Sequence, residues 1–210
     1  MKKNIELEYR IEIHPDIFLS TLSFFQNKYK QISKTKRLSF MSFSKNKDKQ
    51  LDFRVRMTNK DLEVVLKLGD LYTNDRIEIS QNILKDQFIG FCRMFSHLSG
   101  DNYIAYRETY NFETKEGIII SLVDANGINY IEYEFISNEA NIKNNNRIIK
   151  EVIKNHGFKI LDEKGFKELN SKLDRADWKF KDTPKNINRL TLELEKMTSE
   201  NENAFNLFKI

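Results

Sequence analysis

Residues 5 to 13 alternate strictly between apolar and charged side chains. Side chains along a β-strand repeat every second residue, so a strand here would carry Glu6, Glu8, Arg10 and Glu12 on one face and five apolar residues on the other. An ordinary amphipathic strand turns its charges to water, but this pattern recurs along the chain with acidic and basic residues divided between segments. The alternation therefore predicts both a sheet and a chemical role for its charged face.

Further strand patterns follow in series. Short polar breaks separate them, and Asn126-Gly127 predicts a tight turn between the last two. Because the connections are short, we expect about eight mostly antiparallel strands, and a closed or nearly closed barrel is one way to remove sheet edges at that number. The predicted class is α+β, an antiparallel barrel of about eight strands with helices packed outside. The strands after the first cover roughly 31–44, 50–58, 62–69, 75–80, 103–112, 117–124 and 129–137.

Helical periodicity appears in four other places. Pro15 opens one pattern, and apolar stripes predict helices over about 83–98, 142–156 and 164–173. Beyond Arg175 the signal weakens. We therefore predict one barrel domain over residues 1–174, followed over 175–210 by a linker, a short helix near 187–197 and a mobile end.

Composition narrows the setting. The 210 residues are 40% hydrophobic with two prolines, enough for one substantial core. No run approaches the roughly 20 apolar residues that span a bilayer, and the N-terminus lacks a secretory stretch, so we expect no membrane partner. Cys92 is the single cysteine and cannot form an internal disulfide, which suits a reducing cytoplasm. A net charge of +4 does not require nucleic acid but is compatible with an anionic ligand.

Charged residues share one face in most of the predicted strands, opposite an apolar face. If the apolar faces pack against helices, the charged faces must point into the barrel. Such an interior would be hydrated and ligand-binding, because isolated buried charges are very costly. The charged faces contain Asp52, Arg54 and Arg56, then Lys67, then Arg76, Glu78 and Ser80, then Arg107, and finally Glu132 and Glu134.

Two Glu-x-Glu pairs begin and end this series. Their carboxylates are hard oxygen ligands, which suit Mg²⁺ or Mn²⁺ held together with waters and substrate phosphates. Guanidinium and ammonium groups on the other strands suit phosphate oxygens. The combination predicts a site for a triphosphate, since such a substrate needs several cations around it and its metal needs carboxylates.

This ordered set resembles the CYTH family of the triphosphate tunnel metalloenzyme superfamily. The resemblance covers about residues 4 to 173. It starts at Glu6-x-Glu8-x-Arg10, close to the family's Glu-x-Glu-x-Lys on the first strand, and Ala105 departs from it where a basic residue often stands. The remaining matches, in order, are Arg54-Val55-Arg56, Leu66-Lys67, Arg76-Ile77-Glu78, Arg107 with Tyr110, and Glu132-Tyr133-Glu134.

The resemblance implies a divalent-metal-dependent phosphohydrolase that cleaves the terminal phosphate of a triphosphate. It implies metal ligation by Glu6, Glu8, Glu132 and Glu134, and it implies that one of these, such as Glu132, or else Glu78, positions or deprotonates the attacking water. It also implies that six basic residues bind the phosphate chain, namely Arg10, Arg54, Arg56, Lys67, Arg76 and Arg107.

Three functions stay open at this point. A lone Glu-x-Glu pair is typical of a solvated strand face, so the interpretation depends on the whole set. The leading hypothesis is a triphosphatase for inorganic triphosphate or a nucleoside or other organic triphosphate, although some relatives cyclise ATP. The second is an RNA 5′-triphosphatase of mRNA cap formation, and the third is a polyphosphate- or nucleotide-binding module without turnover. The sequence leaves the substrate, the choice of metal and the oligomeric state open.

Overall fold

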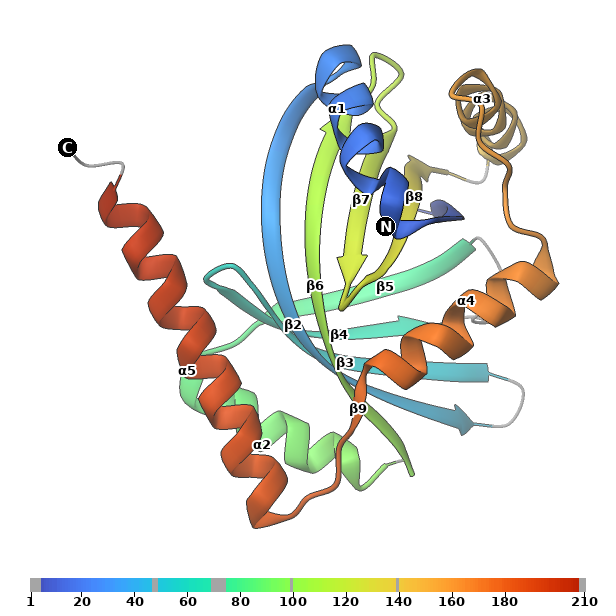
Figure 1. Cartoon of the computed structure of the whole chain (residues 1–210). Helices are drawn as coiled ribbons and strands as arrows, with labels where there is room; N and C mark the ends of the chain where they lie inside the picture. Colours follow the sequence, from blue (N-terminus) through green and yellow to red (C-terminus); the bar gives the residue numbers. More distant parts are fainter. Residues whose placement is uncertain (1–4, 47–48, 69–74, 99, 139, 208–210) are drawn as a thin grey trace. The chain divides into compact units, whose positions relative to one another are not determined.

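The computed structural model describes residues 5–46, 49–68, 75–98, 100–138 and 140–207, the side chains of 45, 46, 49, 50, 75, 76 and 200–207 excepted (Figure 1). Strands and helices follow one another close to the predicted positions. The strands are β1 (Ile5–Ile13), β2 (Lys30–Asn46), β3 (Lys49–Thr58), β4 (Asp61–Leu68), β5 (Asp75–Asn82), β6 (Asp101–Glu113), β7 (Ile119–Ala125), β8 (Ile128–Ser137) and β9 (Trp178–Lys179). The helices are a 3-10 turn (Pro15–Ile17), α1 (Phe18–Lys28), α2 (Lys85–Ser96), α3 (Ile142–Asn155), α4 (Glu163–Ala176) and α5 (Pro184–Leu207).

Strand pairing confirms the antiparallel α+β class. Within the described ranges the strands pair in the order β2-β3-β4-β5-β1-β8-β7-β6-β9, and a further pairing joins β2 to β6. Each of β1 to β8 therefore has paired neighbours on both sides, which removes the free edges that invite association. The predicted turn between β7 and β8 is confirmed, since Asn126 and Gly127 adopt φ of 54° and 86°, the left-handed values that a tight hairpin turn requires.

The chain divides into two compact units, and each is built from several segments. The first unit contains Met1–Thr35, Gly69–Ile77 and Arg107–Ala176. The second contains Lys36–Leu68, Glu78–Tyr106 and Asp177–Ile210. The predicted division into residues 1–174 and 175–210 stays a prediction.

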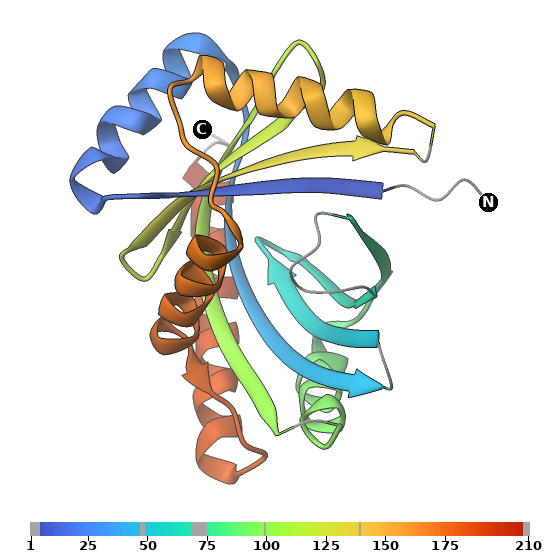
Figure 2. The same ribbon diagram turned by 90° about the vertical axis from the view of Figure 1, so that its right-hand side faces the viewer.

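The first unit packs α1 and α3 against the apolar face of β1, β7 and β8. Tyr9 and Ile11 of β1 lie in one core with Phe25 of α1 and with Ile149 and Ile153 of α3. Figure 2 shows α3 running along β8 and β1. The apolar half of the alternation in residues 5–13 thus faces these helices, as predicted, and Glu6, Glu8 and Arg10 lie on the opposite face.

Helix α4 packs on that opposite face of the first unit. Leu169 and Leu173 of α4 lie in a cluster with Val123, Ala125 and Tyr130 of β7 and β8. In β7, Ile120 and Leu122 belong instead to the core under α1 and α3. Because alternate residues of a strand point to opposite faces, α4 covers one end of the charged face.

The second unit has its own core between the sheet and helices α2 and α5. Val55 and Met57 of β3 are buried with Phe88 and Cys92 of α2. Cys92 is a buried core residue, and its burial raises the pKa of the thiol well above the usual value. Helix α5 is longer than the helix predicted at 187–197 and adds Leu190, Leu194 and Met197 to this core. No helix in the described part of the chain is long and apolar enough to cross a membrane.

His156 joins α1 and α3 to the sheet inside the first unit. Its Nε2 lies 2.6 Å from the Tyr29 hydroxyl and its Nδ1 lies 2.7 Å from the Tyr133 hydroxyl. A neutral imidazole has one donor and one acceptor, so one hydroxyl donates to it and the other accepts from it. Burial, together with the nearby charge of Lys28, lowers the pKa of His156 from the usual 6.5 to about 4.

We expect the folded protein to lose stability as the pH falls from about 6.5 toward 4. In this range His156 is protonated in the unfolded chain but still neutral in the folded protein. The loss by pH 4.5 should be about 2 kcal/mol, allowing for partial exposure of the ring. Urea unfolding at pH 7 and pH 4.5 measures it. The stability gap between wild type and His156→Gln should shrink by that amount at pH 4.5, whereas exposed His14→Gln should show no such change. A gap that is equal at both pH values contradicts this account.

Candidate functional site

The charged face of β1 and β8 in the first unit, here called the acidic face, contains Glu6, Glu8, Arg10, Glu132 and Glu134. The two strands are antiparallel neighbours, and their register places Glu8 directly opposite Glu134 and Arg10 directly opposite Glu132. Glu6 lies one step further along, opposite an isoleucine. The four predicted metal ligands are therefore gathered on one face of two paired strands.

Arg10 links the two strands across this face. Its Nη2 lies 2.6 Å from Oε1 of Glu8, and its Nε donates to Oε2 of Glu132 at 2.9 Å. Burial alone would lower the pKa of Arg10, but Glu8 and Glu132 raise it above its usual value. The guanidinium is therefore a permanent positive charge on the acidic face.

The donor chemistry of this face fits a divalent cation. Like charges directly opposite each other destabilise an antiparallel pair, so Glu8 and Glu134 require a positive charge nearby. Carboxylates are also the ligands that Mg²⁺ and Mn²⁺ prefer. However, among the described side chains no three His, Cys, Asp or Glu residues lie close enough together to hold a metal ion. Arg10 supplies one compensating positive charge, against four carboxylates on this face.

Two predicted phosphate-binding residues lie on other strands of the same unit. The backbone of Arg76 on β5 pairs with Glu6, while its side chain is outside the described ones. Arg107 lies on β6 and contributes positive charge around Tyr130, whose pKa is raised mainly by burial. Arg76 therefore lies on the strand that pairs with β1, whereas β7 separates the strand of Arg107 from β8.

The other predicted basic residues lie together in the second unit. Arg54, Arg56 and Lys67 define its basic face, on β3 and β4. Asp52 holds Arg54 in a two-pronged ion pair, with Nε to Oδ1 at 3.0 Å and Nη2 to Oδ2 at 2.7 Å. The Asp52 side chain is completely buried, at 0% exposure, and it holds the Arg54 guanidinium in a fixed position on this face.

Glu78 connects the two other cations of the basic face. Its Oε1 accepts from Nη2 of Arg56 at 2.8 Å, and its Oε2 lies 2.9 Å from Nζ of Lys67. Burial alone would raise the pKa of Glu78, but Lys67 and Arg56 lower it below its usual value. Glu63 also accepts from Nε of Arg56, at 2.7 Å. A carboxylate with a lowered pKa is a weak proton acceptor, so Glu78 suits the positioning of Arg56 and Lys67 better than deprotonation of water.

Several contact residues escaped the sequence interpretation. Glu63 could have been found, since it alternates with Lys67 on one face of β4. By contrast, Tyr130, Phe166 and Asn170 surround the Arg10 guanidinium, and no pattern in the sequence indicates their proximity. Phe166 was expected only as an apolar residue of its helix.

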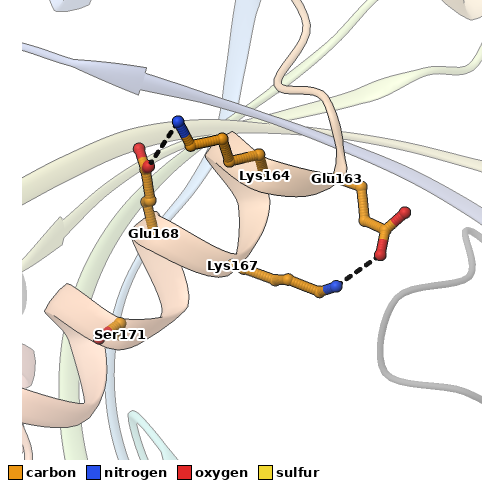
Figure 3. A pocket seen from close by; sticks show the side chains of 5 residues that line it. All are labelled: Glu163, Lys164, Lys167, Glu168 and Ser171. Atoms are coloured by element: carbon orange, nitrogen blue, oxygen red, sulfur yellow. Dashed lines mark hydrogen bonds and ion pairs between the residues drawn. The ribbon is translucent and has the colours of Figure 1, made fainter.

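A pocket of about 490 Å³ lies on the outer surface of α4 (Figure 3). Its lining includes the ion pairs Lys167–Glu163, at 2.5 Å, and Lys164–Glu168, at 3.8 Å. All its lining residues come from this helix. The four charged ones form these two exposed ion pairs, and such pairs contribute little to stability. We therefore assign this pocket no part in the candidate site.

Comparison with known proteins establishes the fold. No family model and no curated protein matches the chain. A conserved hypothetical protein from Pyrococcus furiosus is 20% identical over 74% of this chain and 94% of its own, with a TM-score of 0.58. The PH1819 protein from Pyrococcus horikoshii is 16% identical over 80% of this chain and 98% of its own, with a TM-score of 0.59.

One further solved structure is less similar to this chain. A putative adenylyl cyclase from Hippeastrum, described as having a dominant triphosphatase activity, is 13% identical over 75% of this chain and 89% of its own. Its TM-score is 0.48. The two Pyrococcus proteins share the fold with this chain, and at 16–20% identity the likeness extends no further.

Proposed function

We propose that this chain is a divalent-metal-dependent triphosphatase that hydrolyses the terminal phosphate of a small triphosphate. The observation that supports this most is the register of β1 and β8, which sets Glu8 opposite Glu134 and places Glu6 and Glu132 on the same face. Four carboxylates on two paired strands are unfavourable without a cation. We assign Glu6, Glu8, Glu132 and Glu134 to a Mg²⁺ or Mn²⁺ site.

The basic residues would bind the phosphate chain. Arg54 is held rigidly by Asp52, and Arg56 and Lys67 are held by Glu78, so their charged groups are positioned before substrate arrives. Positioned cations stabilise the charge that develops on a transferred phosphoryl group. We assign the same role to Arg10, Arg76 and Arg107.

The acidic face would activate the water that attacks the terminal phosphate. A bound Mg²⁺ or Mn²⁺ would lower the pKa of a coordinated water and offset phosphate charge. We assign the orientation of the attacking water to Glu132, which lies on the acidic face and is held in place there by the Nε of Arg10. Glu78 would orient Arg56 and Lys67, so it supports the reaction without accepting a proton.

A comparison of three substrates tests the proposal. Phosphate release is measured from inorganic triphosphate, ATP and triphosphate-ended RNA, each with Mg²⁺ and with Mn²⁺. We expect metal-dependent release from inorganic triphosphate or ATP. Faster release from RNA would favour the cap-forming activity. Tight binding of triphosphate with no release from any substrate would overturn the enzymatic proposal and favour a binding module.

A further inference from the structure

Each of the three guanidinium nitrogens of Arg10 contacts a side-chain oxygen. Besides Glu8 on Nη2 and Glu132 on Nε, the Oδ1 of Asn170 lies 3.4 Å from Nη1. The guanidinium carbon also lies 5.5 Å from the ring centre of Tyr130 and 5.3 Å from that of Phe166. These distances are within the range of cation–π contacts, which become stronger when the cation is withdrawn from water.

Two of these contacts come from α4. Phe166 and Asn170 are four residues apart, so they lie on one side of the helix, one turn apart. Further contacts hold this region to β1 at Arg10 and at Glu12: the backbone N–H of Leu161 donates to the carbonyl of Arg10 at 3.2 Å, and Lys172 contacts Glu12 at 2.5 Å. The guanidinium is therefore caged by a helix that is itself fixed to the same strand.

The cage has a chemical consequence for the acidic face. Arg10 binds Glu8 and Glu132, and a divalent cation would need those same carboxylates. A guanidinium that is held in place competes with the metal more effectively than one that is free to swing away, because the cage opposes its departure. Phosphate oxygens could draw Arg10 off the carboxylates, and this would favour metal binding when substrate is present.

We propose that Phe166 and Asn170 are positioning residues that keep Arg10 on Glu8 and Glu132 as a built-in counter-ion, and that they thereby weaken metal binding until a polyphosphate engages Arg10. This inference rests on the proposed function in one respect, the assignment of the acidic face to a divalent cation. Helix α4 then has two roles: Leu169 and Leu173 pack in an apolar cluster, and Phe166 and Asn170 affect the affinity for the metal.

The test is a titration of the purified full chain with Mn²⁺ in the absence of any triphosphate. The electron paramagnetic resonance signal of free Mn²⁺ reports how much of the metal is bound. Arg10→Gln should bind Mn²⁺ about tenfold more tightly, since a positive charge is removed beside the ligands. Asn170→Ala and Phe166→Leu/Asn170→Ala should each bind it about threefold more tightly. Neither change should have any further effect in the Arg10→Gln background.

Two controls keep the outcome specific. Ser171→Ala, an exposed change on α4, should leave Mn²⁺ affinity unchanged, and thermal unfolding checks that each variant is folded. If Phe166→Leu/Asn170→Ala does not fold, Asn170→Ala alone decides.

Equal shifts with and without Arg10, no shift in either cage variant, or no Mn²⁺ binding at all would each overturn the inference. Because the titration contains no substrate, these outcomes are independent of whether the chain hydrolyses triphosphates.

Discussion

Replacing Glu6 and Glu8 together by Gln is expected to reduce metal-dependent phosphate release by at least about a hundredfold. The substitutions preserve size and remove two carboxylates from the acidic face, where β1 and β8 place them beside Glu132 and Glu134. A bound metal supplies several kcal/mol to phosphoryl transfer, and each 1.4 kcal/mol corresponds to about tenfold in rate. The measurement is kcat/KM for phosphate release at saturating metal.

Glu12→Gln is the matched control for this prediction. Glu12 lies on the same face of the same strand, but it contacts Lys172 at 2.5 Å and has no predicted role in metal binding. We expect its activity to stay within about twofold of wild type, as for a surface ion pair. Full activity in Glu6→Gln/Glu8→Gln, or an equal loss in Glu12→Gln, would rule out the proposed ligand set.

Asp52→Ala should destabilise the fold by about 3 kcal/mol. The change leaves Arg54 without the carboxylate that binds it at 2.7 Å and opens space at a site that is completely buried. Breaking a buried ion pair from one side costs about 3–5 kcal/mol, and the lower end applies because Arg54 keeps some contact with water. Urea unfolding measures this loss against a total stability on the order of 5–15 kcal/mol.

Two comparisons separate the buried charge from general packing. Asp52→Leu/Arg54→Met removes both charges of this ion pair and should recover at least half of the lost stability, because the Arg54 charge is removed together with the carboxylate that binds it. Glu63→Ala should cost about 1 kcal/mol or less, since Arg56 retains Glu78. A double variant as unstable as Asp52→Ala would show that the loss does not come from separating Arg54 from the Asp52 carboxylate.

Much of the sheet could be predicted because its signals are local. Alternation in residues 5–13 depends only on the two-residue repeat of a strand, and Asn126-Gly127 is a turn signal read from two adjacent residues. The same repeat correctly divided apolar from charged faces. The gathering of Glu8 and Glu134 on paired strands follows from the predicted order only once the register is known.

The surroundings of the charges could not be predicted, because they depend on tertiary contacts. Asn170 lies 160 positions from Arg10 in the chain, yet its amide oxygen is at the guanidinium. Helix α4 had a clear apolar stripe, but a stripe does not say which face of the sheet it covers. The length of α5 was missed for a different reason: residues beyond Met197 are mostly polar, so no burial pattern marks the rest of that helix.

Phosphate release from inorganic triphosphate, with Mn²⁺ or Mg²⁺ and then with EDTA, tests the central claim most directly. The account predicts release that requires the metal and returns to background when EDTA removes it. Release that continues unchanged in EDTA, or none with either metal from inorganic triphosphate, ATP or triphosphate-ended RNA, would contradict it.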